Sequence, residues 1–332
     1  MKKFKQSAML IFMMMLVFSA CGGGGGNDDP DNPDSILEIN GDTYTYTLPG
    51  GTIFNAILTP DIAVSKSFPT GPEDNGSANV PARFIMLETE VTYQLWKEVY
   101  DWATSTERGT KKYAFANAGT MGDGSGDTNQ HPVTRVSWRD SIVWCNALTE
   151  YYNANNGSET DLVCVYTYSG SIIRDSRNSN ATACDGAVAG SVKGFRLPRS
   201  MEWEFVARYR GTNNTNVVSG FSNPYYTKGD SASGAASDYN NASMTSAVAV
   251  YGRSGTAVVK SKNESSANTL GFYDMSGNVW EWCFDKDGAS TSRVARGGCF
   301  GDEARYVQVG GYSAAESSYQ SDRRGLRFCM TK

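Results

Sequence analysis

Cysteine and histidine are the side chains of this sequence that could support metal or nucleophilic chemistry. The chain has seven cysteines but only one histidine, His131. No two cysteines have C-x-x-C spacing, so the sequence predicts no metal site. His131 stands alone before Pro132, where we expect it to be a hydrogen-bonding residue of a loop or strand edge. Because no nucleophile has an evident base partner, the sequence predicts that the protein is not an enzyme.

Disulfide formation is the other chemistry open to these cysteines. An even number beyond Cys21 is typical of disulfides in an exported protein, and the six are Cys145, Cys164, Cys184, Cys283, Cys299 and Cys329. Spacing alone cannot choose among the possible connectivities. We expect Cys164 and Cys184 to pair first, because they flank a polar, turn-rich insert. Cys283 with Cys299 is a second candidate pair.

One acidic side chain, Glu281, stands between two tryptophans in a Trp-Glu-Trp run. A carboxylate in such apolar surroundings must be hydrogen-bonded or paired. We therefore expect an ion pair with an arginine such as Arg196 or Arg296, in a structural rather than a catalytic role. Just before this run, Gly277-Asn278 favours a tight turn with positive φ.

Residues 299–324 have an unusual composition. They include three tyrosines together with serines, glycines, acids and arginines, but no Leu, Ile, Met, Trp, Lys or Pro. A framework strand pair would be richer in branched apolar residues, whereas rigid aromatics among small polar neighbours are typical of a paratope. We therefore predict a ligand-binding surface in this segment. The alternative is an ordinary solvated loop.

A frame of short strands must position these residues. Apolar runs that alternate with turn signals predict two or three strands within residues 36–63 and another at residues 84–87. The stretch 212–268 is rich in Ser, Asn, Gly and Ala and is expected to be mostly loop. From Leu270 onward we expect short strands without a clear helix.

Three helices are expected between these strands. Apolar residues at helical spacing predict one at residues 92–103, with Thr92 as its N-cap. Ser137 and Asp140 are spaced to cap a second helix. A short third helix is expected around residues 201–209. With 35 glycines and little helical periodicity elsewhere, the sequence predicts a loop-rich fold.

The start of the chain is typical of an exported lipoprotein. Residues 1–20 combine lysines with an apolar run too short to span a membrane, and predict a signal peptide. Small residues before Cys21 favour its lipidation, and ordinary cleavage with a spare thiol is the alternative. Residues 21–35 predict a flexible Gly, Asp, Asn and Pro tether. Residues 36–332 show no strong composition break, which predicts a single domain.

The charge of the chain argues against nucleic acid as a partner. The formal net charge is −5, and Lys and Arg are not clustered. Because binding to phosphates requires such clusters, we exclude nucleic acid and expect contact with a membrane only through the lipid anchor.

Several motifs stand in an order that resembles the formylglycine-generating-enzyme, or sulfatase-modifying-factor, family. The most specific is the run Gly271-Phe-Tyr-Asp-Met-Ser-Gly-Asn-Val-Trp-Glu-Trp282. The others are Glu90-Val91-Thr92, His131-Pro132-Val133 with Val136-Ser137-Trp138, Phe195-Arg196-Leu197-Pro198 with Glu202-Trp203-Glu204, Arg293-Val294-x-Arg296-Gly297-Gly298, and Gly325-Leu326-Arg327. The resemblance implies an α+β, C-type lectin fold that is loop-rich, with few helices and short mixed strands.

The resemblance also argues against oxidase activity. Catalytic members of the family carry two cysteines just after the Arg-Val-x-x-Gly-Gly-Ser strand, where their thiolates bind copper and substrate. At the matching positions this chain has Asp302 and Val307, and Cys299 takes the place of the serine. Neither a carboxylate nor an isopropyl group supplies soft thiolate ligation.

A second resemblance is to the variable proteins of diversity-generating retroelements, most closely those of the treponemal type. In these systems template adenines are randomised, so asparagine codons become a restricted set of residues. Only Glu303, Gln308, Glu316 and Gln320 of residues 299–324 lie outside that set, and no asparagine remains. The resemblance implies that the diversified binding residues include most of Phe300, Gly301, Asp302, Arg305, Tyr306, Gly311, Tyr312, Ser313, Ser318, Tyr319, Ser321, Asp322 and Arg323.

Together these features predict a monomeric, surface-exposed lipoprotein of the outer membrane. It would act as a receptor or adhesin for a protein ligand on another cell or host surface, with no cofactor. One alternative is an invariant lectin-like or structural lipoprotein that binds glycan or protein, and another is an enzyme related to the oxidase. A structural calcium on the loop from Asp274 to Asn278 is a further hypothesis.

Overall fold

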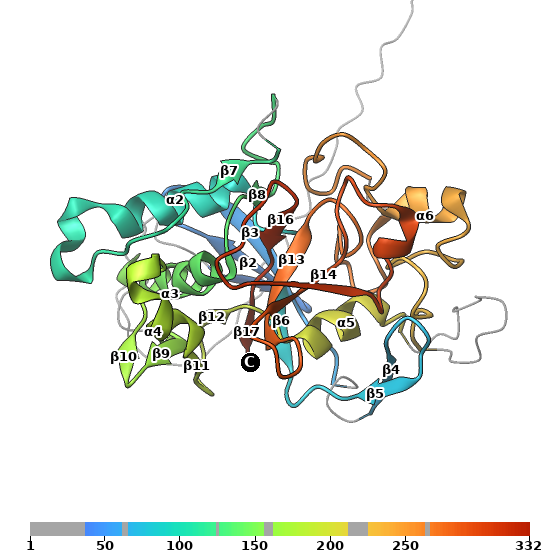
Figure 1. Cartoon of the computed structure of the whole chain (residues 1–332), viewed down its shortest axis with the longest axis horizontal. Helices are drawn as coiled ribbons and strands as arrows, with labels where there is room; N and C mark the ends of the chain where they lie inside the picture. The colour runs from blue at the N-terminus through green and yellow to red at the C-terminus, as the bar shows by residue number, and fades with distance from the viewer. Residues whose placement is uncertain (1–36, 62–65, 124–125, 156–161, 212–224, 263–265) are drawn as a thin grey trace, which may run out of the picture. The chain divides into compact units, whose positions relative to one another are not determined.

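The computed structural model describes residues 37–61, 66–123, 126–155, 162–211, 225–262 and 266–332. The predicted signal peptide, Cys21 and tether lie outside the described residues. Two larger sheets and a small number of helices form the described part (Figure 1). The expected α+β architecture is confirmed, with many short strands and few helices.

The first sheet has six antiparallel strands and includes strands from both ends of the domain. Its order is β1 (Glu38–Asn40), β2 (Thr43–Thr47), β3 (Ile53–Leu58), β6 (Phe84–Leu87), β17 (Cys329–Thr331) and β12 (Phe195–Arg196). The three strands at its start and the strand at residues 84–87 confirm the sequence prediction. Because β17 lies between β6 and β12, the end of the chain is held inside this sheet.

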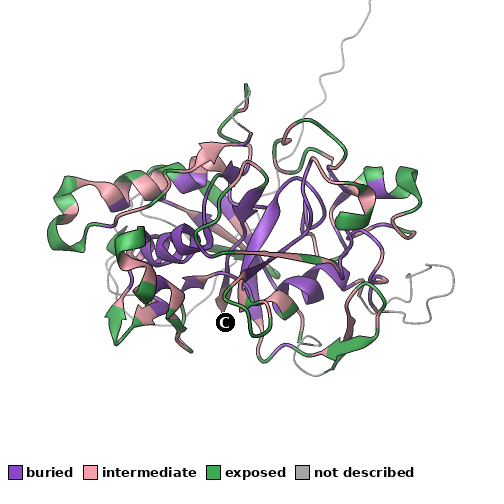
Figure 2. Cartoon of the chain, viewed as in Figure 1, coloured by how far each residue is buried: buried purple, intermediate pink, exposed green. Residues whose placement is uncertain are grey.

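The second sheet has four strands and positions the candidate site. Its order is β15 (Tyr312–Ala315), β14 (Arg293–Arg296), β13 (Trp280–Lys286) and β16 (Arg324–Leu326). β16 runs parallel to β13, and the other pairs are antiparallel. Figure 2 shows β13 buried along most of its length. Residues 297–323 therefore connect β14 to β16 and contribute β15 to the edge of this sheet.

Smaller strands complete the fold. A three-stranded sheet contains β10 (Ser171–Ile172), β9 (Tyr166–Tyr168) and β11 (Val188–Ala189). Two-stranded pairs are β4 (Phe68–Thr70) with β5 (Gly76–Ala78), and β7 (Thr120–Met121) with β8 (Val133–Thr134).

The predicted helices are present, and their caps follow the sequence signals. The α-helices are α2 (Tyr93–Thr104), α3 (Trp138–Asn155), α4 (Ala181–Asp185), α5 (Ser200–Arg208) and α6 (Ala242–Val248), and the 3-10 helices are η1 (Thr106–Lys111), η3 (Asn178–Asn180) and η5 (Ala304–Tyr306). The Thr92 hydroxyl accepts from Leu95 N, which begins α2. Asp140 N donates to Ser137 Oγ at the start of α3. Residues 212–268, which were expected to be mostly loop, also contain the short helix α6. Its first turn is capped by Asn241 Oδ1, which accepts from Met244 N.

Aromatic residues fill the core between these elements. Trp96 of α2 stacks on Trp144 of α3 with ring centroids 5.4 Å apart. The indole N–H of Trp138 donates to Cys283 O, and that of Trp282 donates to Val136 O, so the indole groups also find acceptors. These contacts join α2, α3 and β13 into a rigid frame beneath the candidate segment.

Candidate functional site

The segment 299–324 begins at a glycine pair that turns the chain away from β14. Gly297 has φ 98° and Gly298 has φ 78°. A Cβ on Gly298 would lie 2.7 Å from Tyr306 O, so η5 packs directly against this turn. The predicted Gly277-Asn278 turn is also confirmed, with φ 85° and 58°.

The candidate residues of this segment are distributed over its surface, with one exception. The exposed ones are Arg305, Tyr306, Tyr312, Ser318, Tyr319 and Arg323. The half-buried ones are Gly301, Asp302, Gly311, Ser313, Ser321 and Asp322. Phe300 differs, because only 4% of it is exposed. Its ring lies beneath the Arg323 guanidinium, at 5.8 Å from the centroid, and therefore belongs to the support of the surface.

The three tyrosines are the most exposed aromatic residues of the segment. Tyr306 is 46% exposed, Tyr312 56% and Tyr319 47%. By contrast, the tryptophans of β13, Trp280 and Trp282, are 8% and 0% exposed. The frame therefore buries its own aromatic residues and leaves those of the segment in contact with solvent.

Two buried valines attach the middle of the segment to the frame. Val307 and Val309 are both fully buried. Ser276 Oγ donates to Val307 O at 2.7 Å, and Val309 N donates to Ser231 O at 2.8 Å. The backbone of both valines is therefore held by residues outside the segment.

Arg324 is a buried cation under this surface that the sequence analysis missed in favour of its neighbour Arg323. Its guanidinium lies 4.7 Å from the Trp282 ring centroid and 5.3 Å from that of Tyr319. Nη2 donates to Ser313 Oγ at 2.8 Å, while Nη1 has no acceptor among the described residues. Burial lowers the pKa of Arg324. The signal that could have indicated its burial is its place in β16, because successive residues of a strand face opposite sides of the sheet.

A pocket of about 410 Å³ opens beside Tyr312. Tyr312 lines it together with Asp285, Asp287 and Arg296. The Tyr312 hydroxyl donates to Asp287 Oδ1 at 3.3 Å, and the Arg296 guanidinium lies 5.6 Å from the Tyr312 ring centroid. One tyrosine of the segment thus forms a wall of a cavity whose other walls belong mostly to the frame.

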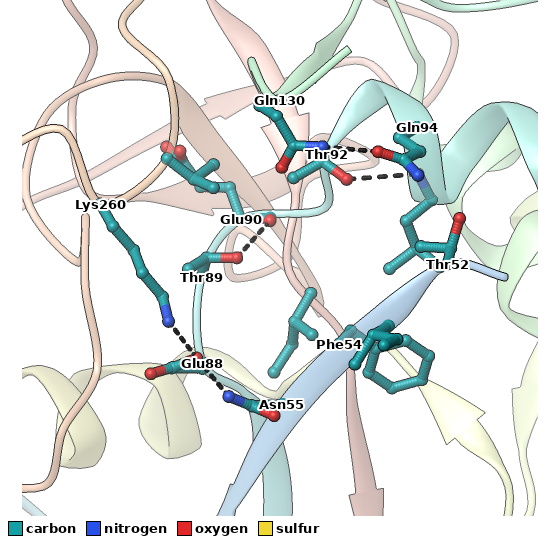
Figure 3. Close-up of a pocket in the computed structure, with 14 residues that line it drawn as sticks. Thr52, Phe54, Asn55, Glu88, Thr89, Glu90, Thr92, Gln94, Gln130 and Lys260 are labelled. Carbon is teal, nitrogen blue, oxygen red and sulfur yellow. Dashed lines mark hydrogen bonds and ion pairs between the residues drawn. The ribbon is translucent and has the colours of Figure 1, made fainter. Parts of the chain in front are cut away.

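A second pocket, of about 290 Å³, lies between β3, β6 and the start of α2 (Figure 3). Lys260 Nζ and Asn55 Nδ2 both donate to Glu88 Oε2, at 2.6 and 3.2 Å, and Gln130 Nε2 donates to Gln94 Oε1 at 2.5 Å. Its polar groups therefore bond largely to one another, and no residue of 299–324 lines it.

Glu281 forms a structural ion pair, but neither of the expected arginines is its partner. Arg327 Nη2 donates to Glu281 Oε1 at 2.7 Å, and Trp203 Nε1 donates to Oε2 at 2.7 Å. Arg196 instead pairs with Glu202 and Arg296 with Glu204. Glu281 and Arg327 are both fully buried, so their pairing is inaccessible to substrate.

Two further carboxyl groups lie near this pair and titrate abnormally. Burial raises the pKa of Asp274 to about 6, although a hydrogen bond from Lys260 N opposes the shift. Burial and the charge of Asp274 raise the pKa of Glu90. Glu90 accepts from Asn278 Nδ2 and Val279 N, which holds the tight turn to the frame. The calcium hypothesis for the loop from Asp274 to Asn278 stays a prediction.

The expected disulfides are not formed. All six cysteines of the described residues are free and buried. Cys164 Sγ donates to Asn146 O at 3.5 Å and Cys184 Sγ to Asp175 O at 3.2 Å, so each thiol of the first expected pair has its own acceptor. Burial raises the pKa of Cys299 to about 12, which keeps this thiol protonated at neutral pH. His131 is a loop hydrogen-bonding residue, as expected, and its Nε2 lies 3.0 Å from Asp127 Oδ1.

Comparison with known proteins assigns the chain to a family. A family model described as the sulfatase-modifying factor enzyme 1-like domain matches residues 44–332. The chain therefore belongs to this family, as the sequence motifs predicted. The family match and the similar solved structures confirm the C-type lectin fold of the formylglycine-generating-enzyme type. Membership in the family does not by itself exclude enzyme activity.

Individual relatives are similar over most of the chain. Chaperone protein LppX of Paenibacillus barcinonensis is 25% identical over 302 residues, which cover 84% of this chain and 92% of that protein. The structure of Treponema denticola variable protein 1 is 25% identical with a TM-score of 0.58, and the match covers 87% and 99% of the two chains. The structure of CarF, at 24% identity and a TM-score of 0.55 over 80% and 95% of the two chains, shares the fold. The family and the likeness to a variable protein together support a ligand-binding scaffold.

Within the described residues, no helix combines the length and apolar character needed to cross a membrane. The same residues contain no group of three or more His, Cys, Asp or Glu side chains placed to hold a metal ion.

Proposed function

We propose that this protein is a lipid-anchored receptor or adhesin that binds a protein ligand through the surface of residues 299–324. The observation that carries the proposal is the exposure of Tyr306, Tyr312 and Tyr319, at 46%, 56% and 47%, on a frame that buries its tryptophans. Tyrosines are enriched at protein interfaces because they offer a large contact area at a small entropy cost.

The support beneath the segment favours a surface that tolerates changes of side chain. Arg253 N donates to Phe300 O at 2.7 Å, and Gly252 N donates to Asp302 O at 2.9 Å, so both contacts involve only backbone atoms. With the buried valines, these contacts fix the backbone, so stability does not depend on the exposed side chains. The similarity to a variable protein adds support for diversification of these positions.

Location at the cell surface is part of the proposal. Residues 1–20 and Cys21 supply the expected export and lipidation signals, and the similarity to chaperone protein LppX adds support for a lipoprotein. We place the protein in the outer membrane with the domain facing outward, because a polar tether would separate it from the lipid. The ligand would then be a protein on another cell or on a host surface, bound by a monomer without a cofactor.

Alanine substitution of the three tyrosines tests this function. The ligand is first identified by probing the protein against an arrayed set of host and bacterial surface proteins and of glycans. Y306A, Y312A and Y319A are then expected to weaken binding while the melting temperature stays nearly constant. Tyr168, which is 37% exposed on β9, offers a matched control as Y168A. Unchanged binding in all three variants, or a glycan as the bound partner, would contradict the proposal.

The neighbouring DNA tests diversification separately. We expect a near-identical repeat of the segment's coding sequence downstream, differing only at adenines, beside a reverse transcriptase gene. If no such repeat is found, the segment is invariant, and an invariant lectin-like or structural lipoprotein becomes the better description.

A further inference from the structure

β15 forms one edge of the four-stranded sheet and lies inside the proposed binding segment. It pairs with β14 from Arg293↔Ala315 to Arg296↔Tyr312. In the part of the chain that the structure describes, no other strand pairs with it, and no backbone hydrogen bond from a loop reaches residues 312–315. Alternate residues of an antiparallel edge strand direct their N–H and C=O away from the partner. β15 therefore offers unpaired backbone groups along its free edge.

This edge lacks the features by which proteins usually block strand addition. Natural edge strands carry lysine, proline, bulges or charges that prevent pairing with another chain. β15 has the sequence Tyr-Ser-Ala-Ala, and the first charged residue after it is Glu316. Tyr312 is exposed, and the three small residues after it are half-buried. Small side chains leave room for a neighbouring strand at the usual spacing.

The 410 Å³ pocket is lined by Tyr312, the first residue of β15, and by residues of β13, β14 and α5, and it contains three carboxylates and two cationic side chains. Arg296 is already satisfied by Glu204, Ser200 Oγ and the carbonyls of residues 310 and 311. Asp287, in contrast, accepts from the Tyr312 hydroxyl and has no cation within 4.0 Å among the described residues.

Two other charged groups also line this pocket. Asp285 accepts from Ser200 N and lies 3.9 Å from Arg199 Nη1. Lys286 also lines the pocket, and its positive charge opposes the negative charge of Asp285. The carboxylate of Asp287 thus remains available beside the exposed ring of Tyr312. A lysine or arginine side chain could contact both groups.

We infer that the protein ligand binds as an extended segment that adds a strand to the free edge of β15 and places a lysine or arginine beside Asp287 and Tyr312. The inference rests on the proposed function and specifies how its ligand is bound. Backbone hydrogen bonds would supply sequence-independent affinity, and the pocket would select the cationic residue.

Hydrogen exchange of the full chain in detergent tests this inference with synthetic peptides as probes. One heptapeptide alternates Thr and Val around a central Lys, and its partner carries Glu in place of Lys. The Lys peptide is expected to slow amide exchange in residues 312–315 and to bind about tenfold more tightly than the Glu peptide. Asp287→Asn should reduce this preference severalfold, whereas Glu107→Gln, on the exposed η1, should leave it unchanged.

The outcomes separate this inference from the proposed function. If neither peptide protects residues 312–315, or if both peptides bind equally well, strand addition with a cationic residue is wrong. The receptor function stands in that case as long as the tyrosine variants still lose the natural ligand. Stronger protection of residues 312–315 by the Lys peptide than by the Glu peptide, with this difference reduced in D287N, supports the inference whatever the natural ligand is.

Discussion

The buried pair of Glu281 and Arg327 gives a quantitative test of the fold. We expect Glu281→Gln to destabilise the protein strongly while preserving the shape of the side chain. Glu281 accepts three hydrogen bonds from Arg327, at 2.7, 2.9 and 3.1 Å, and a fourth from Trp203 Nε1. The substitution leaves the Arg327 guanidinium buried without its principal counter-charge.

The size of the effect follows from the burial of both groups. Removal of one partner from a fully buried ion pair costs about 3 to 5 kcal/mol. The remaining Arg327 acceptors, Leu87 O and Tyr273 O, are neutral and do not replace the lost charge. Since a typical domain is stable by about 5 to 15 kcal/mol, the variant should unfold at a much lower urea concentration.

Urea unfolding followed by tryptophan fluorescence measures this effect. If the dependence of the unfolding free energy on urea concentration is unchanged, the shift of the midpoint reports the loss of stability. Glu303→Gln is the matched control, because Glu303 pairs with Arg305 at the surface and its loss should cost less than about 1 kcal/mol. In the double variant E281Q/R327M, removal of the unpaired charge should restore part of the lost stability. A loss below about 1 kcal/mol in E281Q would contradict the structural role of this ion pair.

Two further predictions concern titration and thiol chemistry. Because the pKa of Asp274 is raised to about 6, the folded protein binds its proton more tightly than the unfolded chain does, and stability is lost as pH rises through 6. In Asp274→Asn, up to about 3 kcal/mol of this pH-dependent loss of stability should disappear. Urea unfolding between about pH 4 and 7 measures it, and an unchanged pH dependence in the variant would contradict the raised pKa of Asp274. Since all six described cysteines are free and buried, a thiol reagent should modify them only after unfolding, as followed by mass spectrometry. Rapid labelling of the folded protein, or a mass lower by two hydrogens, would contradict this.

Local signals allowed much of the frame to be predicted from the sequence. The caps of α2 and α3 depend on residues within one helical turn, so Thr92 and the pair Ser137 and Asp140 could be recognised directly. The partner of Glu281 could not, because it depends on the parallel register of β13 and β16, which places Glu281 opposite Gly325 and near Arg327. Strand pairing between distant segments leaves no local signal.

The cysteines and the candidate site show the same limit. Cys164 and Cys184 flank a turn-rich insert, but spacing along the chain does not determine which way two thiols point. In the segment 299–324, residue types indicated an exposed surface, and the tyrosines are indeed exposed. The burial of Phe300 was not predicted, because in an irregular segment no periodicity assigns side chains to an inner or outer face. The role of the tyrosines in binding remains a prediction.

The buried valines at positions 307 and 309 have a practical consequence for protein engineering. They divide the segment into two stretches, residues 300–306 and 311–323, which meet where the Arg323 guanidinium lies over the Phe300 ring. A combinatorial library could randomise the outward positions of either stretch while both valines are kept. Such a library would vary one half of the surface at a time on one stable carrier, so the contribution of each half to binding could be selected separately.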